Sequence, residues 1–469
     1  MIFHPQTVTK TEGQFMFSDC VHAISHPCLN RGIIKEFWQN FTHQTSTLHI
    51  TSETEQYMFS IGNVQVIDPA EDDYSIHVSP CGVCVSAKSE GDLIRGFLTL
   101  LDRFLATDQG DKTVITIEAC QIRDRVVLRN RMIHFCVFPE TELWELHRFV
   151  RFCSALKFTH IVLEFWGMLR YDCLKELSWP HSFTKEQVRP IIREANDLGV
   201  EIIPMFNHWG HAAASRVTHG KHVVLDQNPT LQTYFSEDGW CWDIRKPKVR
   251  ALLRQIRAEL TELCGKGSYF HVGCDEAFNY DFSKENMDLI CDFLNEISVE
   301  MNAENRRIIA WGDMFLYRHE HYRPDNIYTC NAPSPEAERY LLSRLDKNVV
   351  IADWQYDAKH TPVETASTFL QAGFDCMLCP WDRGFAELDA CITTAKQQKL
   401  MGILHTTWHT LSAGVPYVLL AATKSLEEDC PLIKTHARTY AATLMRKVMP
   451  AHGDYEKSGW SKYEVSYKW

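Results

Sequence analysis

Apolar and polar positions follow two different patterns along the chain. From about Val126 onward, short apolar runs are followed by loops and then by amphipathic stretches. Eight of these runs are predicted strands: "MIHFCV", "HIVLEFW", "VEIIPMF", "YFHVGC", "RRIIAWG", "VVIADW", "FDCMLCP" and "MGILHTTW". Eight strands, most of them followed by a helical stretch, match the count of a (β/α)8 TIM barrel.

The first part of the chain, to about Arg125, follows the other pattern. Short segments of alternating polarity ("TSTLHITS", "DDYSIHVS", "GVCVSAK", "TVITIEA") surround one clear helix, "SEGDLIRGFLTLLDRFLA", which opens with the capping pair Ser89 and Asp92. This pattern predicts a small α+β domain with an antiparallel sheet. The fold class is therefore α/β: an α+β accessory domain (1–125), a catalytic barrel (126–430) and a C-terminal helical extension packed on the barrel (431–469).

Capping residues also mark a helix inside the predicted barrel. In "TKEQVRPIIREANDLG", Thr184 precedes the first helical turn and Gly199 follows the last. Thr is a favoured N-cap because its hydroxyl accepts an orphan backbone N–H, and Gly is favoured just past a helix end. We expect a helix between these two residues.

Composition narrows the possible partners. The 469 residues are 45% hydrophobic with a formal net charge of −12, and no Lys/Arg run resembles those that bind phosphates or anionic lipids. No apolar run approaches the length of a membrane span, and the start "MIFHPQTVTKTEGQF" lacks a signal-peptide pattern. We expect neither a nucleic acid nor a membrane partner, and a cytoplasmic location unless a signal has been trimmed. The oligomeric state is left open.

The 17 cysteines mostly lie inside apolar runs, as in "RFCSALKF". Buried reduced thiols pack as small hydrophobes, and cysteines scattered in this way favour a reducing compartment over a disulfide framework. "CGVC" at Cys81 to Cys84 has C-x-x-C spacing, but no second pair lies at zinc-ligand distance. We expect no metal or other cofactor.

Polar and aromatic side chains gather at the ends of the predicted strands. Because the carboxyl ends of barrel strands share one face, these side chains are expected in one pocket. Tryptophan stacks on the apolar face of a sugar ring while charged groups take its hydroxyls, so the set indicates a carbohydrate site. Its members are Arg131, His134, Glu164, Trp166, Asn207 to His211, His271, Asp275, Glu276, Trp311, Asp313, Asp353, Trp354, Tyr356, Trp381, Asp382, Trp408 and His409.

The adjacent carboxylates Asp275 and Glu276 are the centre of this prediction. Two carboxylates divide the work of glycoside hydrolysis when one is held protonated and the other ionised. Neighbouring residues of a strand point to opposite faces, so both reach one pocket only if the chain turns. Gly273, just before the pair, permits that turn.

Around this pair, "HVGCDE" strongly resembles the H-x-G-x-D-E signature of glycoside hydrolase family 20, the β-N-acetylhexosaminidases. "NHWGHAAAS", "NRMIHF", "AWGDM" and "TTWHT" resemble other strand-end segments of that family, and the first domain resembles the small domain that precedes its barrel. The resemblance covers most of the chain. The Cys in "GCDE" and the His in "RMIHF" are most similar to the branch that includes hexosaminidase D.

The resemblance implies an exo-acting, retaining enzyme that removes terminal GlcNAc or GalNAc from a glycan or oligosaccharide. Glu276 would be the general acid/base, and Asp275 would orient the substrate's 2-acetamido group, whose carbonyl oxygen is the nucleophile that gives an oxazolinium intermediate. The remaining roles also come from the resemblance. His211 and His271 would support the acid, and Arg131 would bind ring hydroxyls. The residues that line the sugar-binding site would be Trp311, Trp354 and Trp408.

The chain also departs from the family pattern. Met132 stands where the family usually has Gly, and Cys136 where it has Asp. The family's seventh-strand Tyr, which binds the acetamido oxygen, has no clear match; Trp381, Asp382 and Tyr356 are the candidates to replace it. The eighth-strand W-x-E appears as Trp408, His409, Thr410.

Two other functions stay open at this point. The missing Tyr and Glu motivate a non-catalytic glycan-binding relative of the family. A metal-dependent barrel hydrolase is the third candidate, although the H-x-H usual on the first strand of such enzymes is absent. Its ligands would be His134, Cys136, His211, His271 and Asp275.

Overall fold

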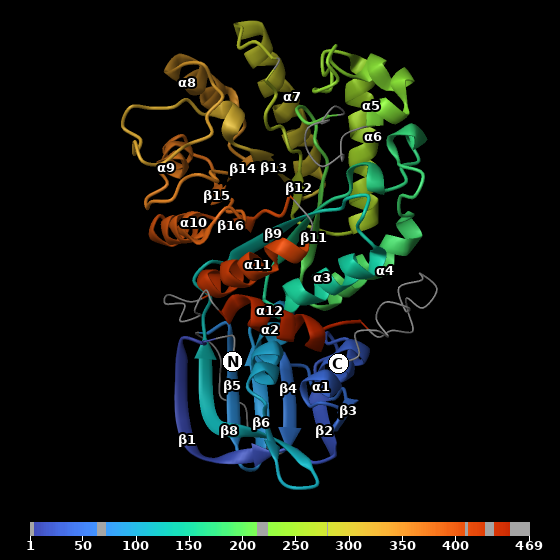
Figure 1. Ribbon diagram of the computed structural model, residues 1–469, viewed down its shortest axis with the longest axis vertical. Helices are drawn as coiled ribbons and strands as arrows, with labels where there is room; N and C mark the ends of the chain where they lie inside the picture. Colours follow the sequence, from blue (N-terminus) through green and yellow to red (C-terminus); the bar gives the residue numbers. More distant parts are fainter. Residues whose placement is uncertain are drawn as a thin grey trace.

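The computed structural model describes residues 4–62, 72–212, 224–278, 280–408, 411–426 and 436–450. Figure 1 shows an N-terminal sheet at one end of the molecule and a barrel at the other, with helices between them. Among the described residues, no helix combines the length and apolar character needed to cross a membrane.

The N-terminal sheet has eight strands in the order β1-β8-β5-β6-β4-β2-β3, with β7 paired to β8. All pairs are antiparallel except β2 with β3. The strands are β1 (Thr7–Met16), β2 (Cys20–Ser25), β3 (Thr47–Thr51), β4 (Met58–Gly62), β5 (Tyr74–Ser79), β6 (Gly82–Ala87), β7 (Leu105–Asp108) and β8 (Thr113–Asp124). The predicted α+β fold of this part, with a largely antiparallel sheet, is confirmed.

Two helices accompany this sheet. Helix α2 (Glu90–Asp102) packs on β5 and β6, and Ser89 caps it by accepting the N–H of Asp92, as the sequence predicted. Helix α1 (Arg31–Phe41) packs beside β3 and was not predicted, although Asn30 caps it with its side chain.

The barrel is closed by eight parallel strands, as predicted, with β16 paired to β9. The strands are β9 (Asn130–Cys136), β10 (His160–Glu164), β11 (Glu201–Met205), β12 (Tyr269–His271), β13 (Arg307–Trp311), β14 (Val350–Asp353), β15 (Cys376–Leu378) and β16 (Gly402–His405). Its interior is a packed apolar core that includes Met132, Met205, Met377 and Leu404. Met132, at a position where the family has Gly, therefore fills the barrel.

Helices surround the barrel strands. They are α3 (Leu143–Ala155), α4 (Lys185–Asp197), α5 (Val224–Gln227), α6 (Pro247–Cys264), α7 (Lys284–Ala303), α8 (Pro335–Arg344), α9 (Glu364–Gln371), α10 (Phe385–Gln397), α11 (Leu411–Leu426) and α12 (Ala437–Lys447), with short 3-10 turns η1 (Trp166–Met168), η2 (Lys175–Leu177), η3 (Pro229–Tyr234) and η4 (Asp313–Phe315). The predicted caps of α4 are present: Thr184 accepts the N–H of Gln187, and Gly199 has φ 73° just past the helix end.

Of the predicted C-terminal extension (431–469), the structure describes 436–450, which includes α12, while 431–435 and 451–469 lie outside the described residues. Helix α12 contacts α3 and α11 of the barrel and also α1 of the first domain. It therefore lies against both parts of the chain, as Figure 1 shows in red.

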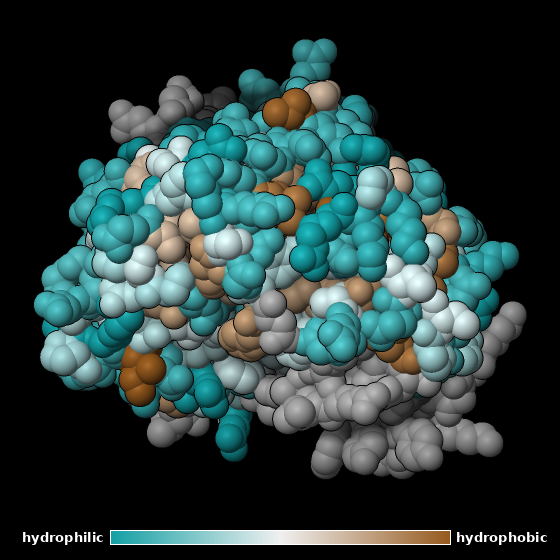
Figure 2. Space-filling view, turned by 90° about the horizontal axis from the view of Figure 1, so that it is seen from above, coloured by the Kyte–Doolittle hydropathy of each residue, from teal (hydrophilic) through white to brown (hydrophobic). Residues whose placement is uncertain are grey.

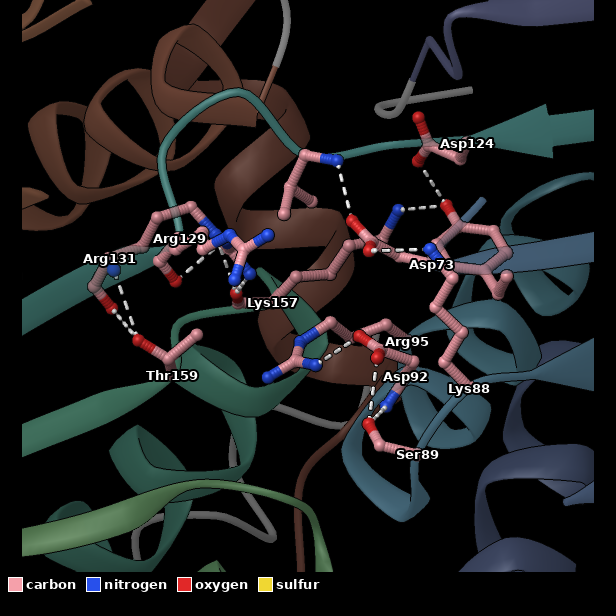
Figure 3. A network of polar contacts seen from close by, with 12 residues as sticks. Asp73, Lys88, Ser89, Asp92, Arg95, Asp124, Arg129, Arg131, Lys157 and Thr159 are labelled. Carbon is pink, nitrogen blue, oxygen red and sulfur yellow. Dashed lines mark hydrogen bonds and ion pairs between the residues drawn. The ribbon is translucent and has the colours of Figure 1, made fainter. Parts of the chain in front are cut away.

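Buried polar contacts join the sheet to the amino ends of the barrel strands (Figure 3). Lys157, just before β10, donates a 3.0 Å hydrogen bond to the hydroxyl of Tyr74 on β5, and that hydroxyl donates to Asp124 at the end of β8. All three side chains are buried. Because a buried charge is costly unless it is hydrogen-bonded, this chain of contacts favours one arrangement of the two parts.

Candidate active site

A tight turn follows β12 and carries the two carboxylates. Gly273 has φ 67°, and a Cβ added there would collide with Oδ1 of Asn207, so this position requires glycine. Cys274 (φ 78°) and Glu276 (φ 47°) also adopt left-handed backbone conformations, which are uncommon for residues other than glycine and concentrate at functional sites. The turn predicted from Gly273 is present, and three of its residues have left-handed backbone conformations.

The turn brings Asp275 and Glu276 to one histidine. Nε2 of His211 lies 2.8 Å from Oε2 of Glu276 and 3.4 Å from Oδ2 of Asp275. The side chain of Asp275 is 9% exposed, whereas that of Glu276 is 28% exposed. The two carboxylates therefore occupy different environments, which is the condition for different roles in one reaction.

Asp313, in η4 directly after β13, binds the backbone of this turn. Its Oδ2 accepts the backbone N–H of Glu276 at 3.0 Å and the amide of Asn331 at 2.7 Å, and its Oδ1 accepts the indole N–H of Trp354 at 3.1 Å. Burial, and next the charge of Asp275, raise the pKa of Asp313 to about 7. A third carboxyl group therefore belongs to the site, and it connects the turn to an aromatic wall.

The aromatic wall is formed by residues at the carboxyl ends of four neighbouring strands. The indole N–H of Trp408 donates to the hydroxyl of Tyr356 at 2.6 Å. The ring of Tyr356 lies 5.0 Å from those of Trp354 and Trp381, and Trp311 lies 5.7 Å from Trp408. The structure thus brings together five of the predicted aromatic residues, whereas Trp166 packs on Phe206 and Trp209 on Tyr280. Asp382 follows Trp381 in the same loop and is partly buried.

His271 is the last residue of β12, two residues before Gly273. Its ring is fully buried, 4.3 Å from the ring of Trp311, and its Nδ1 accepts the N–H of Gly273 at 3.0 Å. Burial lowers the pKa of His271 to about 3, so the imidazole is neutral. Among the contacts described, His271 holds the backbone of the turn and supports Trp311.

A second buried cluster lies nearby at the ends of β9, β10 and β11. Nε2 of His134 is 3.1 Å from Oε2 of Glu164, whose Oε1 accepts the amide of Asn207 at 3.2 Å. The His134 ring also lies 4.4 Å from that of Trp408. This cluster supports the aromatic wall and the strand that leads to His211.

The prediction that Arg131 binds ring hydroxyls is wrong. Arg131 is the second residue of β9 and pairs in register with Ile403 near the start of β16, at the amino ends of the strands. Arg131 is 1% exposed, and its guanidinium donates to the carbonyl oxygen of Lys157 at 2.8 and 3.1 Å (Figure 3) and to that of Leu128 at 2.7 Å. Five further residues of β9 follow it, at about 3.3 Å each, so Arg131 lies at the other end of the barrel from the carboxylate turn.

Three site residues received no role from the sequence. Asp313 stood in the strand-end set only as a lining residue, and Asn331 lies in the loop before α8. Trp240 comes from the segment between η3 and α6; its indole N–H donates to the carbonyl of Glu276 at 2.5 Å, and its ring lies 4.7 Å from that of His211. Trp240 follows no strand, so strand-end position could not identify it. The predicted pair His409 and Thr410 lies outside the described residues.

The metal-dependent hypothesis finds no supporting geometry in the part of the chain that the structure describes. No three His, Cys, Asp or Glu side chains in that part are arranged to hold a metal ion. Cys136, one of its predicted ligands, is buried at the end of β9.

Fold and site together define a (β/α)8-barrel protein with a histidine-linked carboxylate pair facing an aromatic wall, which are parts suited to work on a glycoside. Residues 162–417, more than half of the chain, match the family model "Glycosyl hydrolase family 20, catalytic domain", and the protein belongs to this family. The family predicted from "HVGCDE" is thereby confirmed.

Individual relatives are distant in sequence. A Beta-hexosaminidase of Porphyromonas gingivalis is 21% identical over 281 residues, which cover 52% of this chain and 36% of that protein, so the match spans about a third of the relative's length. An exo β-N-acetylglucosaminidase of Vibrio harveyi, solved with N-acetylglucosamine, superposes with a TM-score of 0.66 at 17% identity, covering 94% of this chain and 75% of that one. An N-acetyl-β-hexosaminidase of Streptomyces plicatus gives 0.66 at 14% identity, covering 97% and 94%. These structures share the fold.

Proposed function

We propose that this protein is an exo-acting, retaining β-N-acetylhexosaminidase that releases terminal GlcNAc or GalNAc from glycans or oligosaccharides. The observation that carries the proposal is the contact of one imidazole nitrogen, Nε2 of His211, with both Glu276 and Asp275. A carboxylate pair tied together in this way suits one proton-transfer group and one group that holds the substrate.

The different exposed fractions of the two carboxylates support different roles for them in the reaction. Glu276, the more exposed, is placed to give its proton to the glycosidic oxygen as the bond to C1 breaks. Asp275, the more buried, is placed to accept the N–H of the acetamido group, whose carbonyl oxygen attacks C1 and forms the oxazolinium ion. Water then attacks C1 from the face of the departed group and loses a proton to Glu276, so the configuration at C1 is retained.

Tyr356 is our choice among the three candidates to replace the family's Tyr. Its hydroxyl accepts the indole N–H of Trp408 and, at 3.1 Å, the hydroxyl proton of Thr406, so its own proton is available for the acetamido carbonyl oxygen. Burial raises the pKa of Tyr356 well above its usual value, which keeps that proton in place. A donor aimed at the developing charge of the acetamido group would lower the barrier to attack.

Family membership, the predicted kinship with hexosaminidase D and the names of the relatives support the choice of an N-acetylhexosamine substrate. The Porphyromonas protein is a Beta-hexosaminidase, and the Vibrio enzyme was solved with N-acetylglucosamine. We further propose a reducing, cytoplasmic location, supported by the cysteines of the described residues, all of which are free.

The test is hydrolysis of 4-nitrophenyl β-N-acetylglucosaminide and of its galacto counterpart by the wild type and by Glu276→Gln. We expect the wild type to cleave at least one of them and Glu276→Gln to lose about 10² or more of kcat. Glu285→Gln, an exposed glutamate at the start of α7, is the matched control and should keep its activity. If neither substrate is cleaved at any pH while GlcNAc-thiazoline binds, the protein is a non-catalytic glycan-binding relative.

A further inference from the structure

An interdomain cavity lies at the opposite end of the barrel from the carboxylate turn. It is lined by the start of α2 in the N-terminal domain, by the end of α4, and by the first residues of β9, β10 and β11. Its volume is about 440 Å³, within the range of about 300–1,000 Å³ typical of small-molecule sites. By contrast, the face of the molecule seen from above is mostly hydrophilic, with small separate apolar patches (Figure 2). The cavity is therefore the stronger candidate for a second binding site.

Two glycines bring the two parts of the chain into contact beside this cavity. Gly199, after α4, has φ 73°, and a Cβ added there would lie 3.2 Å from Cα of Gly91 and 3.2 Å from Cδ1 of Ile94, both in α2. Side chains seldom approach so closely, so this contact between α2 and the end of α4 favours glycine. Gly91 and Gly199 both line the cavity, so closely packed backbone forms part of its boundary.

Two cations that line the cavity have no ion pair with any of the described residues. They are Arg129, directly before β9, and Lys266, in the loop between α6 and β12; both are exposed. The amide of Asn196, near the end of α4, also lines the cavity without a hydrogen bond to the described residues. These three groups are free to bind a ligand.

Two of the three acids in the lining already have hydrogen-bond donors. Both carboxylate oxygens of Glu201 accept from Ser268, one from its backbone N–H and the other from its hydroxyl at 3.0 Å. Asp197 accepts the amide of Asn30 at 2.8 Å. The third acid, Glu90, is exposed in the first turn of α2. The lining therefore offers more free donors than free acceptors.

Further positive charge lies close to the cavity. Arg131 is buried, and among the described residues its guanidinium donates to carbonyl oxygens and to no carboxylate. Arg95 lines the cavity and pairs with Asp92 at 2.6 Å (Figure 3). Burial, and next the charges of Arg95 and Arg131, lower the pKa of His160 to about 3, although Oε2 of Glu201 lies 3.7 Å from its Nε2. The cations therefore outweigh the nearby acid at this position.

We infer that the interdomain cavity binds a phosphate monoester of a small polyol, of which a sugar phosphate is the simplest case. Arg129 and Lys266 would bind the phosphate, because guanidinium and ammonium groups form charge-assisted hydrogen bonds with phosphate oxygens. The cavity is larger than a phosphate group, and Asn196 is placed to bind a hydroxyl group of the remainder. The inference does not depend on the proposed function.

The experiment is calorimetric titration of the full chain with glucose 6-phosphate. We expect a Kd below about 1 mM for the wild type. Arg129→Gln and Lys266→Gln should each raise this Kd about fivefold, because each removes a charge-assisted contact. Glucose and inorganic phosphate, titrated separately, should each bind at least about fivefold more weakly than glucose 6-phosphate.

Arg339→Gln is the matched control. It removes the same charge from an exposed side chain on α8, which lies between β13 and β14 of the barrel, away from the strands that line the cavity. Its Kd for glucose 6-phosphate should equal that of the wild type. Arg129 and Lys266 are both exposed, so their substitution should leave the fold intact.

Each outcome decides for or against the site. Weaker binding in Arg129→Gln and Lys266→Gln, with wild-type binding in Arg339→Gln, supports it. A wild-type Kd above about 10 mM, or a Kd in both cavity variants within about twofold of the wild type, overturns it. Inorganic phosphate or glucose binding as tightly as glucose 6-phosphate also overturns it, since the ligand would then not be a phosphate monoester. The readout is binding alone, so a failure of the proposed hydrolysis would not affect it.

Discussion

The backbone N–H of Glu276 donates a 3.0 Å hydrogen bond to Oδ2 of Asp313. The same carboxyl group accepts the indole N–H of Trp354 through its other oxygen. Asp313 therefore fixes the distance between the turn that carries the proposed acid and the wall that would enclose the acetamido group. Because catalysis depends on holding reacting groups in register, this buried aspartate should act on the reaction without contacting the leaving group.

Asp313→Asn should lower activity and change the pH dependence of stability. One acceptor oxygen becomes an amide N–H₂ group that faces a donor, so we expect kcat/KM on an aryl glycoside to fall about tenfold. The pKa of Asp313 is raised from 3.8 to about 7, so the folded state holds this proton more tightly than the unfolded state. The stability it contributes is full below about pH 4 and is lost as the pH rises through 7.

Thermal midpoints of the two proteins between pH 4 and 8 measure this effect. The midpoint of the wild type should fall relative to that of Asp313→Asn as the pH rises across this range. Asp325→Asn is a matched control, since Arg323 lowers the pKa of that exposed carboxyl group and the sign is opposite. Parallel curves for wild type and Asp313→Asn would show that Asp313 is ionised throughout.

His211→Asn removes the imidazole but keeps a residue that tolerates the left-handed conformation at this position (φ 52°). We expect kcat to fall on the order of 10². His319→Asn, which breaks a similar 2.6 Å contact with Glu338 in the loop after η4, should leave kcat unchanged. Wild-type kcat in His211→Asn would show that this imidazole does not support the proposed acid.

Tyr356→Phe tests the residue proposed to bind the acetamido carbonyl. Removing one donor to a developing oxyanion typically costs about 10² in kcat, and we expect a loss of that order together with weaker binding of GlcNAc-thiazoline. Tyr322→Phe is the control, because its hydroxyl bonds Thr368 instead. Wild-type activity in Tyr356→Phe would transfer the role to Trp381 or Asp382.

Tyr74→Phe tests the contact between the N-terminal sheet and the barrel. The substitution removes the hydroxyl that lies between Lys157 and Asp124, and hydrogen bonds to charged groups contribute about 2 kcal/mol each. The thermal midpoint should fall while kcat stays at the wild-type value, because the network lies at the amino ends of the strands. Tyr57→Phe, on an exposed ring, should change neither quantity. A lower kcat at temperatures where Tyr74→Phe is folded would connect this contact to catalysis.

The barrel and the carboxylate turn could be predicted from the sequence for clear physical reasons. Strands buried on both faces read as continuous apolar runs, and the helix between Thr184 and Gly199 is marked by its own caps. Gly273 indicated the turn in the sequence, and the structure shows why glycine stands there: a Cβ would collide with Asn207. By contrast, β1 has almost no buried side chains, so its sequence carries no alternation to recognise.

The errors have equally specific causes. The position of Arg131 depends on where in the run "NRMIHFCV" the strand begins, and a register of a few residues moves a side chain from one end of the barrel to the other. Trp240 reaches Glu276 from a loop, and contacts of this kind depend on tertiary packing that no local pattern records.

The most direct measurement of the central claim is kcat/KM on a series of aryl β-glucosaminides whose N-acyl group is acetyl, fluoroacetyl, difluoroacetyl or trifluoroacetyl. Each fluorine withdraws electrons from the carbonyl oxygen and weakens it as a nucleophile. If that oxygen attacks C1 while Asp275 holds the N–H and Glu276 protonates the leaving group, kcat/KM should fall steadily, by about 10² or more over the series. Values that do not depend on the number of fluorines would contradict substrate assistance and assign the attack to water or to a carboxylate of the protein.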